Sequence, residues 1–300
     1  MLKIILILLL PTFLFAQDVA ESTQQKSYYS VSEGLLKPDS VYILNLRSQF
    51  LSEIPAGVSF FKNLEYLNLM KNNLTSLHQE IYQLKKLQTL NLRQNKLDSL
   101  PAQIGVLKGL KTLDLAKNNF ITLPESIGNL SVLNVLLLSE NKLKTLPSGM
   151  SRLQNLEFLD LDGNQFTEFS LSLCALKKMK NISLRNNHLE AIPNDISQLQ
   201  NLISLNLANN VIEKIPTSIG SLKTIKSLIL DQNKLTYLPD EITQLNLLEL
   251  LVLSNNNITK LPEGIGQLTN LKTLILTGCP ISNEEKQRII KKLPNCDIRF

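Results

Sequence analysis

Apolar residues recur along most of the chain with a fixed period of 23 residues. The period starts at Val41 and runs without insertion or deletion to Leu271, which gives ten complete units and an eleventh that starts and then diverges. Self-similarity at a fixed period of this length is typical of solenoid proteins, in which each unit is one turn of a larger coil. The first residues of the units between these two are Leu64, Leu87, Leu110, Leu133, Leu156, Met179, Leu202, Ile225 and Leu248.

Each unit follows the pattern LxxLxLxxNxLxxLPxxIxxLxx, which residues 87–109 show in full. Leu90 and Leu92 alternate with polar neighbours, and this alternation predicts a strand with one buried face. The spacing then widens to three or four residues, as in Ile104 and Leu107, which predicts a short helical or 3₁₀ return leg. One unit cannot bury its own leucines, so stacked units must share a continuous core.

An asparagine occupies the same place, just after the predicted strand, in nine of the units. An inward Asn side chain offers two donors and an acceptor, enough to satisfy backbone groups in its own and adjacent units. Gln49 and Cys279 replace it in the first and last units, where one neighbour is missing. The column consists of Asn72, Asn95, Asn118, Asn141, Asn164, Asn187, Asn210, Asn233 and Asn256.

These units resemble the leucine-rich-repeat family, in the 23-residue form in which Leu-Pro opens the return leg. The resemblance covers residues 41 to about 281. It implies an α/β solenoid, an arc or horseshoe with a concave parallel β-sheet, short helical or 3₁₀ return legs and terminal caps. We expect a flexible N-terminus and an N-terminal cap at 17–40, ten repeats at 41–270, and a partial eleventh repeat with a helical cap at 271–300.

Both predicted caps have local signals. Before the first strand we expect a short amphipathic helix, in which Leu35 and Leu36 cover the open core. After the last repeat, Ser282 stands three residues before Glu285, which is the spacing of a capping box at the start of a helix. The final residues Cys-Asp-Ile-Arg-Phe are suited to a last edge strand. The apolar stripe expected on the terminal helix consists of Ile289, Ile290 and Leu293.

Residues 1–16 have the features of a secretory signal peptide. Lys3 gives a positive charge, an apolar run follows to Phe15, and the small residue Ala16 precedes polar Gln17. The run is too short to span a bilayer comfortably, and a buried N-terminal helix is the alternative. We therefore expect an exported protein, either secreted or at the cell surface, or alternatively periplasmic. No later stretch is long and apolar enough for a transmembrane segment.

Composition and motifs argue against catalysis and against nucleic-acid binding. The net charge is only +5, Trp is absent, and no Lys/Arg-rich run is present, although attraction to an acidic surface remains open. The chain has no phosphate-binding glycine loop and no catalytic or metal-binding motif, and we expect His78 and His188 at the surface. We predict no catalytic residues, no cofactor and no metal site.

The three cysteines leave one alternative open. Cys279 and Cys296 flank the terminal helix, and in an exported chain they can form a disulfide. The alternative is that both are buried thiols, since small buried cysteines are common. Cys174 lies on a return leg, and we expect it to be unpaired.

Residues between the two strand leucines point to the concave face. Their column is polar at one end and apolar at the other: Asn45, Asn68, Asn91, Asp114, Leu137, Asp160, Ser183, Asn206, Ile229, Val252, Ile275. We predict two partner-binding patches on this face, because exposed apolar clusters mark interaction sites. One is formed by Ile229, Leu250, Val252 and Ile275, and the other by Val135, Leu137, Phe158, Asp160 and Asp162. The alternative for the apolar patch is simple strand propensity.

The sequence thus predicts an exported bacterial leucine-rich-repeat protein that binds a protein or glycan partner through its concave face. Adhesion or host interaction is implied by analogy with the family alone. The alternative is a periplasmic or envelope scaffold for an endogenous protein, and an enzyme is the remotest alternative. The repeat pattern leaves the oligomeric state and the identity of the partner open.

Overall fold

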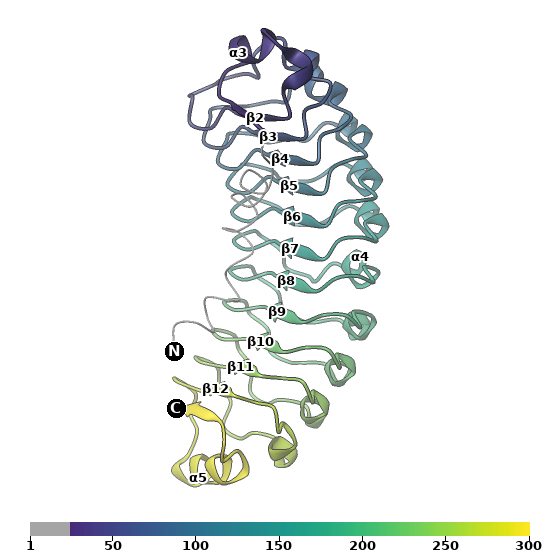
Figure 1. Ribbon diagram of the computed structural model, residues 1–300. Coiled ribbons are helices and arrows are strands. Elements are labelled where there is room, and N and C mark those ends of the chain that lie inside the picture. The colour runs from purple at the N-terminus through teal and green to yellow at the C-terminus, as the bar shows by residue number, and fades with distance from the viewer. Residues whose placement is uncertain (1–24) are drawn as a thin grey trace.

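The computed structural model describes residues 25–300, which form one curved solenoid (Figure 1). The expected signal peptide, residues 1–16, lies outside the described residues. Within the described residues, thirteen parallel strands form one sheet in chain order from β1 to β13. Eleven of them, β2 to β12, are the strands that the repeat predicts, and β1 and β13 belong to the caps. The strands are β1 Ser27–Tyr28, β2 Ile43–Asn45, β3 Tyr66–Asn68, β4 Thr89–Asn91, β5 Thr112–Asp114, β6 Val135–Leu137, β7 Phe158–Asp160, β8 Asn181–Ser183, β9 Ser204–Asn206, β10 Ser227–Ile229, β11 Leu250–Val252, β12 Thr273–Ile275 and β13 Asp297–Arg299.

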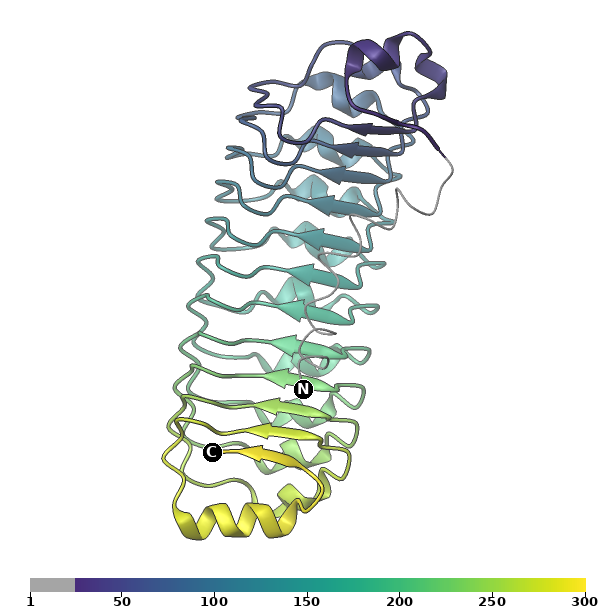
Figure 2. The same cartoon turned by 60° about the vertical axis from the view of Figure 1, so that its left-hand side comes forward.

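The strand register places equivalent residues of successive units side by side. Leu113 of β5 pairs with Leu136 of β6, which pairs with Leu159 of β7, and the same 23-residue offset holds from β2 to β12. All three leucines are completely buried in one core that runs the length of the coil. The loops that precede the strands therefore lie along one lateral edge of the solenoid, and the loops that follow them lie along the other (Figure 2).

The return legs are short 3₁₀ helices stacked along the convex side (Figure 1). In η4, the Leu107 N–H donates to the Ile104 carbonyl, the i to i+3 bond that defines this helix. The sixth unit differs, because Phe169-Ser170 replaces Leu-Pro there and the leg becomes the short α-helix α4, Leu171–Cys174. The 3₁₀ helices are η1 Pro38–Ser40, η2 Val58–Phe60, η3 Gln79–Gln83, η4 Ala102–Val106, η5 Glu125–Asn129, η6 Ser148–Arg152, η7 Asn194–Gln198, η8 Thr217–Ser221, η9 Asp240–Gln244 and η10 Glu263–Gln267.

The asparagine column forms a ladder of hydrogen bonds through the core, as the sequence predicts. The Asn141 side-chain amide donates to the carbonyls of Leu115 and Leu138, at 3.0 and 2.9 Å. Its oxygen accepts the Phe120 N–H at 3.0 Å. Each of the nine asparagines donates in this way to its own unit and to the preceding one. At the end of the ladder the Cys279 thiol lies 3.1 Å from the Leu253 carbonyl and donates in place of the amide.

A left-handed residue stands immediately before each asparagine of the ladder. Lys117 and Glu140, for example, have φ of 56° and 54°. The left-handed conformation costs an L-residue roughly 1–2 kcal/mol. Gly163 occupies one of these positions without that cost, and Gly278 occupies the equivalent position before Cys279. The sharp turn here is what directs the following asparagine into the core.

The N-terminal cap buries residues other than the predicted ones. The helix α3, Val31–Leu35, buries Val31, whereas Leu36 is 82% exposed and Leu35 is 41% exposed. The strand β1, which the sequence did not indicate, pairs with β2 and adds buried Tyr28 to the end of the core. A five-residue helix has one buried side, and the approach of Phe61 to Gly34 sets that side. The prediction that Leu35 and Leu36 cover the core is therefore wrong.

The C-terminal cap contains the helix α5, Asn283–Lys292, and the strand β13. The Ser282 hydroxyl accepts the Glu285 N–H at 3.2 Å, as the capping-box spacing predicts. Ile289 and Leu293, one helical turn apart, are buried against the last repeat, but Ile290 is 45% exposed. The predicted three-residue stripe is thus a two-residue stripe.

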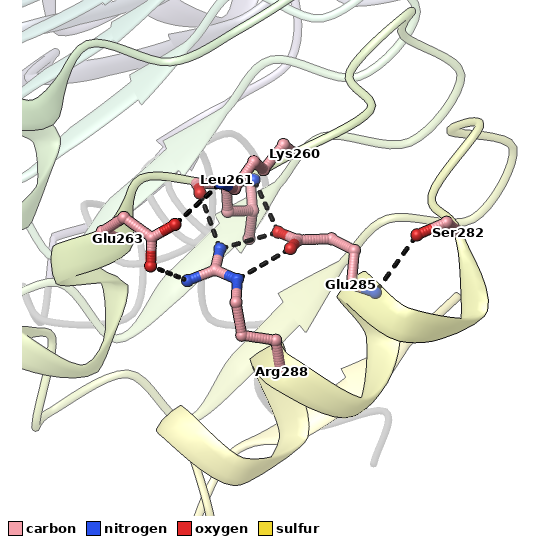
Figure 3. A network of polar contacts seen from close by, with 6 residues as sticks. All are labelled: Lys260, Leu261, Glu263, Ser282, Glu285 and Arg288. Carbon is pink, nitrogen blue, oxygen red and sulfur yellow. Dashed lines mark hydrogen bonds and ion pairs between the residues drawn. The ribbon is translucent and has the colours of Figure 1, made fainter.

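A polar network joins this cap to the last return leg (Figure 3). The Glu285 carboxylate accepts the Leu261 N–H at 2.9 Å, and Arg288 donates to the Leu261 carbonyl at 2.7 Å. Arg288 also donates to both oxygens of Glu285, and its third nitrogen reaches Glu263. Glu285 is almost fully buried, so these bonds compensate its desolvation. The two side chains satisfy the backbone of Leu261 at the point where the repeats end.

Candidate functional site

A groove of about 500 Å³ lies on the concave face and extends mainly from β7 to β12, with Arg93 and Ser139 of earlier units also lining it. It brings together most of both predicted patches, which the sequence treated as separate. Phe158, Asp160 and Asp162 line one end, and the other end is lined by Ile229, Leu250, Val252 and Ile275. Val135 and Leu137 do not line this groove. Val135 instead borders a smaller hollow of about 430 Å³, together with Phe158.

The apolar residues of the concave face are less exposed than the sequence suggests. Val135 and Leu137 are each only 6% exposed, and Leu250 is also buried. Neighbouring strands in a sheet are about 4.8 Å apart, so each side chain is covered from both sides by its equivalents in adjacent units. Ile229, Val252 and Ile275 remain partly accessible and form the apolar floor of the groove.

The polar residues of the concave column have a structural role that sequence reasoning missed. Asp114 accepts the backbone N–H of Ala116, two residues further on, at 3.0 Å. Asp160 accepts the N–H of Asp162 in the same way. Asn45, Asn68, Asn91 and Asn206 make the equivalent bond in their units. Asn and Asp form such local turns readily, which was the available signal.

At the polar end of the groove this local bond is replaced by one from the previous unit. Ser183 occupies the column position in β8. The Asp162 carboxylate crosses from the preceding unit, accepts the Arg185 N–H at 2.8 Å and also accepts the hydroxyl of Ser183. Asp162 is therefore held in place at the polar end of the groove by two donors.

Where the column is apolar, two of the equivalent backbone N–H groups have no partner within residues 25–300. They belong to Ser254 and Thr277, which follow Val252 and Ile275 by two residues, just beyond the ends of β11 and β12. The third equivalent group, the Asp231 N–H, is bonded by the carboxylate of its own residue. The apolar end of the groove thus presents two backbone donors beside its apolar floor. A bound molecule with acceptor oxygens can satisfy them.

Burial alters the acidity of the carboxylates on this face. Burial raises the pKa of Asp162 to about 6, and the nearby Asp160 carboxylate acts in the same direction. Burial also raises the pKa of Asp160 and raises that of Asp114 to about 6. Arg93 and Arg185 line the same groove and partly offset the negative charge. The polar end is therefore an acidic site whose charge increases as pH rises through about 6.

We expect Asp114→Asn to stabilise the protein at neutral pH. The folded state binds the Asp114 proton more tightly than the unfolded chain, so ionisation costs stability as pH rises from about 4 to 6, and the full cost is present above that window. The Asn side chain keeps an oxygen that can accept the Ala116 N–H. Asn91 accepts the equivalent N–H, that of Arg93, in the preceding unit. The expected gain in the free energy of unfolding is about 1–3 kcal/mol.

Urea denaturation, followed by circular dichroism at about pH 4 and about pH 7.5, measures this gain. The difference between wild type and Asp114→Asn should be present at the higher pH and absent at the lower one. The exposed Asp98→Asn is the matched control, with little change at either pH. A loss of stability in Asp114→Asn at the higher pH would contradict the prediction.

The other candidate groups lie apart from the groove. Cys279 and Cys296 are free thiols in the structure, both half-buried, and Cys174 is a buried free thiol. His78 and His188 are exposed, as predicted, and His78 caps the first turn of η3 by accepting the Glu80 N–H. Within residues 25–300 no cluster of His, Cys, Asp or Glu has the arrangement of a metal site. No helix of this part of the chain is long and apolar enough to cross a membrane.

An open parallel solenoid with a groove on its concave face defines a repeat scaffold for protein interaction. Five segments of the chain match the family model for the leucine-rich repeat, and together they cover well over half of the chain. The chain therefore belongs to the leucine-rich-repeat family. The matched residues are 39–97, 85–143, 108–166, 177–235 and 223–281.

Solved structures support this assignment. A leucine-rich-repeat protein of Leptospira interrogans is 30% identical over 92% of this chain and 100% of that one, with a TM-score of 0.53. An internalin of Listeria monocytogenes shares the fold at 22% identity, covering 90% of this chain and 86% of that one, with a TM-score of 0.72. A plant peptide hormone receptor, RGFR1, solved in complex with RGF2, is 25% identical over 79% of this chain, with a TM-score of 0.62. The match covers 43% of that receptor chain. No curated protein matches the sequence.

Proposed function

We propose that this protein is an exported binding protein that holds a protein partner in its concave groove and catalyses no reaction. The observation that carries the proposal is the single groove from β7 to β12, which joins an acidic end to an apolar end. Sites that bind proteins combine apolar anchor positions with polar groups that fix orientation. Export is supported by the signal-peptide features of residues 1–16.

The two unpaired backbone donors favour a polypeptide in the groove. An extended segment offers carbonyl oxygens at regular intervals, and Ser254 and Thr277 offer N–H groups just beyond the ends of two neighbouring strands. Its apolar side chains can contact Ile229 and Val252. A basic side chain can pair with the Asp160 and Asp162 carboxylates, which lie toward the other end. The complex of the plant receptor RGFR1 with RGF2 is consistent with this use of the fold.

Site-specific photo-crosslinking in intact producing cells tests the proposal. A photoreactive amino acid at Val252 should give an adduct of defined mass, because this side chain faces the groove. The same reagent at Val106, which is exposed on the convex side, should give no such adduct. Mass spectrometry of the adduct identifies the partner. Equal yields from both positions would contradict binding in the groove.

A matched pair of variants measures the contribution of the groove once the partner is purified. Aspartate at Ile229, Val252 and Ile275 should weaken binding by roughly a hundredfold or more, because three charges enter an apolar contact. Aspartate at Val106, Ile121 and Ile290, which are exposed apolar residues elsewhere, should leave the affinity unchanged. Calorimetry gives the affinities and circular dichroism confirms the fold. Equal affinity of both triple variants would exclude the groove.

A further inference from the structure

One lateral edge of the solenoid is strongly basic. It consists of ten four-residue segments, each of which joins a return leg to the strand that follows it. We call this set the lysine edge. The segments are residues 62–65, 85–88, 108–111, 131–134, 154–157, 177–180, 200–203, 223–226, 246–249 and 269–272.

The lysine edge carries more positive charge than the whole chain. It holds three glutamates, Glu65, Glu157 and Glu249, and no arginine or aspartate. It also holds eleven lysines, Lys62, Lys85, Lys86, Lys108, Lys111, Lys177, Lys178, Lys180, Lys223, Lys226 and Lys272. The edge is therefore +8, compared with +5 for the full sequence, so the remaining residues have a net charge of −3. All eleven lysines are exposed.

The fold turns these scattered lysines into a row. Equivalent segments lie side by side because the strands after them pair in register, and neighbouring strands are about 4.8 Å apart. Ten segments therefore extend over roughly 40 Å. Side chains of the edge fasten one segment to the next: the Asn155 amide donates to the Ser131 carbonyl at 2.7 Å, and the Lys178 ammonium donates to the Asn155 oxygen at 2.8 Å. These bonds link neighbouring segments, and the lysine side chains are exposed.

The edge is also hollowed where its charge is densest. A cavity of about 520 Å³ lies between Lys178, Lys180 and Lys226, separate from the concave groove. Its floor includes Ile203 and Leu247, two apolar residues that are exposed to solvent. Glu157 borders the cavity and forms an ion pair with Lys180 at 2.8 Å. Lys178 and Lys226 line the cavity too, and each is exposed.

The residue types found in the lysine edge indicate which class of anionic partner it can bind. No aromatic residue occurs in the ten segments, so the edge has neither a stacking platform for unpaired bases nor an aromatic anchor for a membrane interface. It also lacks the arginines that read bases in the grooves of DNA. A long, narrow row of lysines suits a linear chain of charges. Apolar side chains between them can contact the hydrophobic faces of sugar rings.

We propose that the lysine edge binds an acidic polysaccharide, a linear glycan that bears sulfate, phosphate or carboxylate groups. The glycan should bind most strongly at the hollow, where three lysines surround the cavity: Lys178, Lys180 and Lys226. The site is independent of the concave groove, because the two lie on different sides of the strands and share no lining residue. One protein can therefore hold a glycan on its edge and a protein on its concave face.

Heparin is the probe for this site, with binding measured by calorimetry over a series of salt concentrations. The affinity should fall on the order of a hundredfold between 50 and 200 mM salt, by the counterion release that governs other polyanion complexes. Lys177→Gln, Lys178→Gln and Lys180→Gln together should weaken binding roughly tenfold. The matched control is Lys96→Gln, Lys142→Gln and Lys234→Gln, three exposed lysines on the opposite lateral edge, with less than about a twofold effect.

Three results would overturn the proposal. Wild type that does not bind heparin at physiological salt has no such site. An equal loss in the two triple variants means that only the net charge matters. The third result is tighter binding to duplex DNA, or to vesicles rich in phosphatidylserine, than to heparin at the same salt concentration. It would assign the edge to another class of partner. Circular dichroism of both variants must match wild type, as expected for exposed side chains.

Discussion

Replacing Asn141 with alanine should lower the free energy of unfolding by about 3–5 kcal/mol. The change leaves the buried N–H of Phe120 without a partner. It also removes one of the two amide donors of each of the Leu115 and Leu138 carbonyls, which Asn118 and Asn164 still contact. An unsatisfied buried N–H costs about 1–3 kcal/mol, and each of the two other lost bonds adds about 0.5–1.5 kcal/mol. Leu115 and Phe120 belong to the unit that precedes Asn141. The loss therefore weakens the contact between two repeats as well as the turn that contains Asn141.

Hydrogen exchange locates this loss and urea denaturation measures it. In Asn141→Ala the amides of β5 and β6 should exchange faster, while those near either cap change little, since a solenoid is held by nearest-neighbour contacts. Asn257→Ala is the matched control, because the Asn257 side chain is exposed and its backbone is not left-handed. It should change the free energy of unfolding by less than about 0.5 kcal/mol. Similar losses in the two variants would mean that the ladder contributes little.

The ladder and the sheet are the parts of the fold that the sequence predicts best, for a physical reason. A residue type that recurs every 23 positions experiences the same surroundings in each unit, so its role can be inferred once and applied along the chain. Leu136 and Asn141 show this, because both have the burial that the repeat pattern predicts. The caps lack that support. Val31 and Ile290 have no equivalent in another unit, and their burial depends on packing at one end of the coil.

The candidate site was predicted less completely, because it depends on contacts between units. The sequence assigned Asp160 and Ile229 to separate patches, whereas the groove that both residues line follows from the arrangement of the strands between β7 and β12. The bond from Asp114 to the Ala116 N–H could be inferred from the residue type alone. Leu137 was expected in the patch, and its neighbours in adjacent strands cover it.

The lysine edge shows what a linear scan overlooks in a repeat protein. No stretch of the sequence contains a long basic run, and Lys178 and Lys226 are far apart in the chain. The solenoid brings them to the border of one hollow. Aligning the chain by its period, and reading charge down each column, reveals the edge without a structure. The same alignment can reveal other surface patches, wherever the residue type at one position of the repeat changes along the coil.

Leu136→Asp should be among the most damaging single changes in the chain, as should the same change at an equivalent leucine of a neighbouring unit. Leu136 is completely buried in β6, between Leu113 and Leu159 of the neighbouring strands. An aspartate there loses the apolar burial of leucine and places a carboxyl group in a core that offers it no charged partner, at a cost above about 5 kcal/mol. We expect the variant to lose ordered structure over the central repeats at room temperature, as measured by circular dichroism and limited proteolysis.

Deleting the entire unit 133–155 should be tolerated far better than this one substitution. The deletion removes twenty-three residues and brings Leu110 and Leu156 into consecutive units in an unchanged register. Leu113 then pairs with Leu159, and every buried backbone group keeps a partner of the usual kind. We expect a cooperative thermal transition a few degrees below that of wild type, because the shorter solenoid loses one intrinsic and one interface contribution. If the deletion variant were less stable than Leu136→Asp, the units would not be interchangeable elements stabilised by their nearest neighbours, and the central repeats would contain long-range interactions that the 23-residue pattern does not encode.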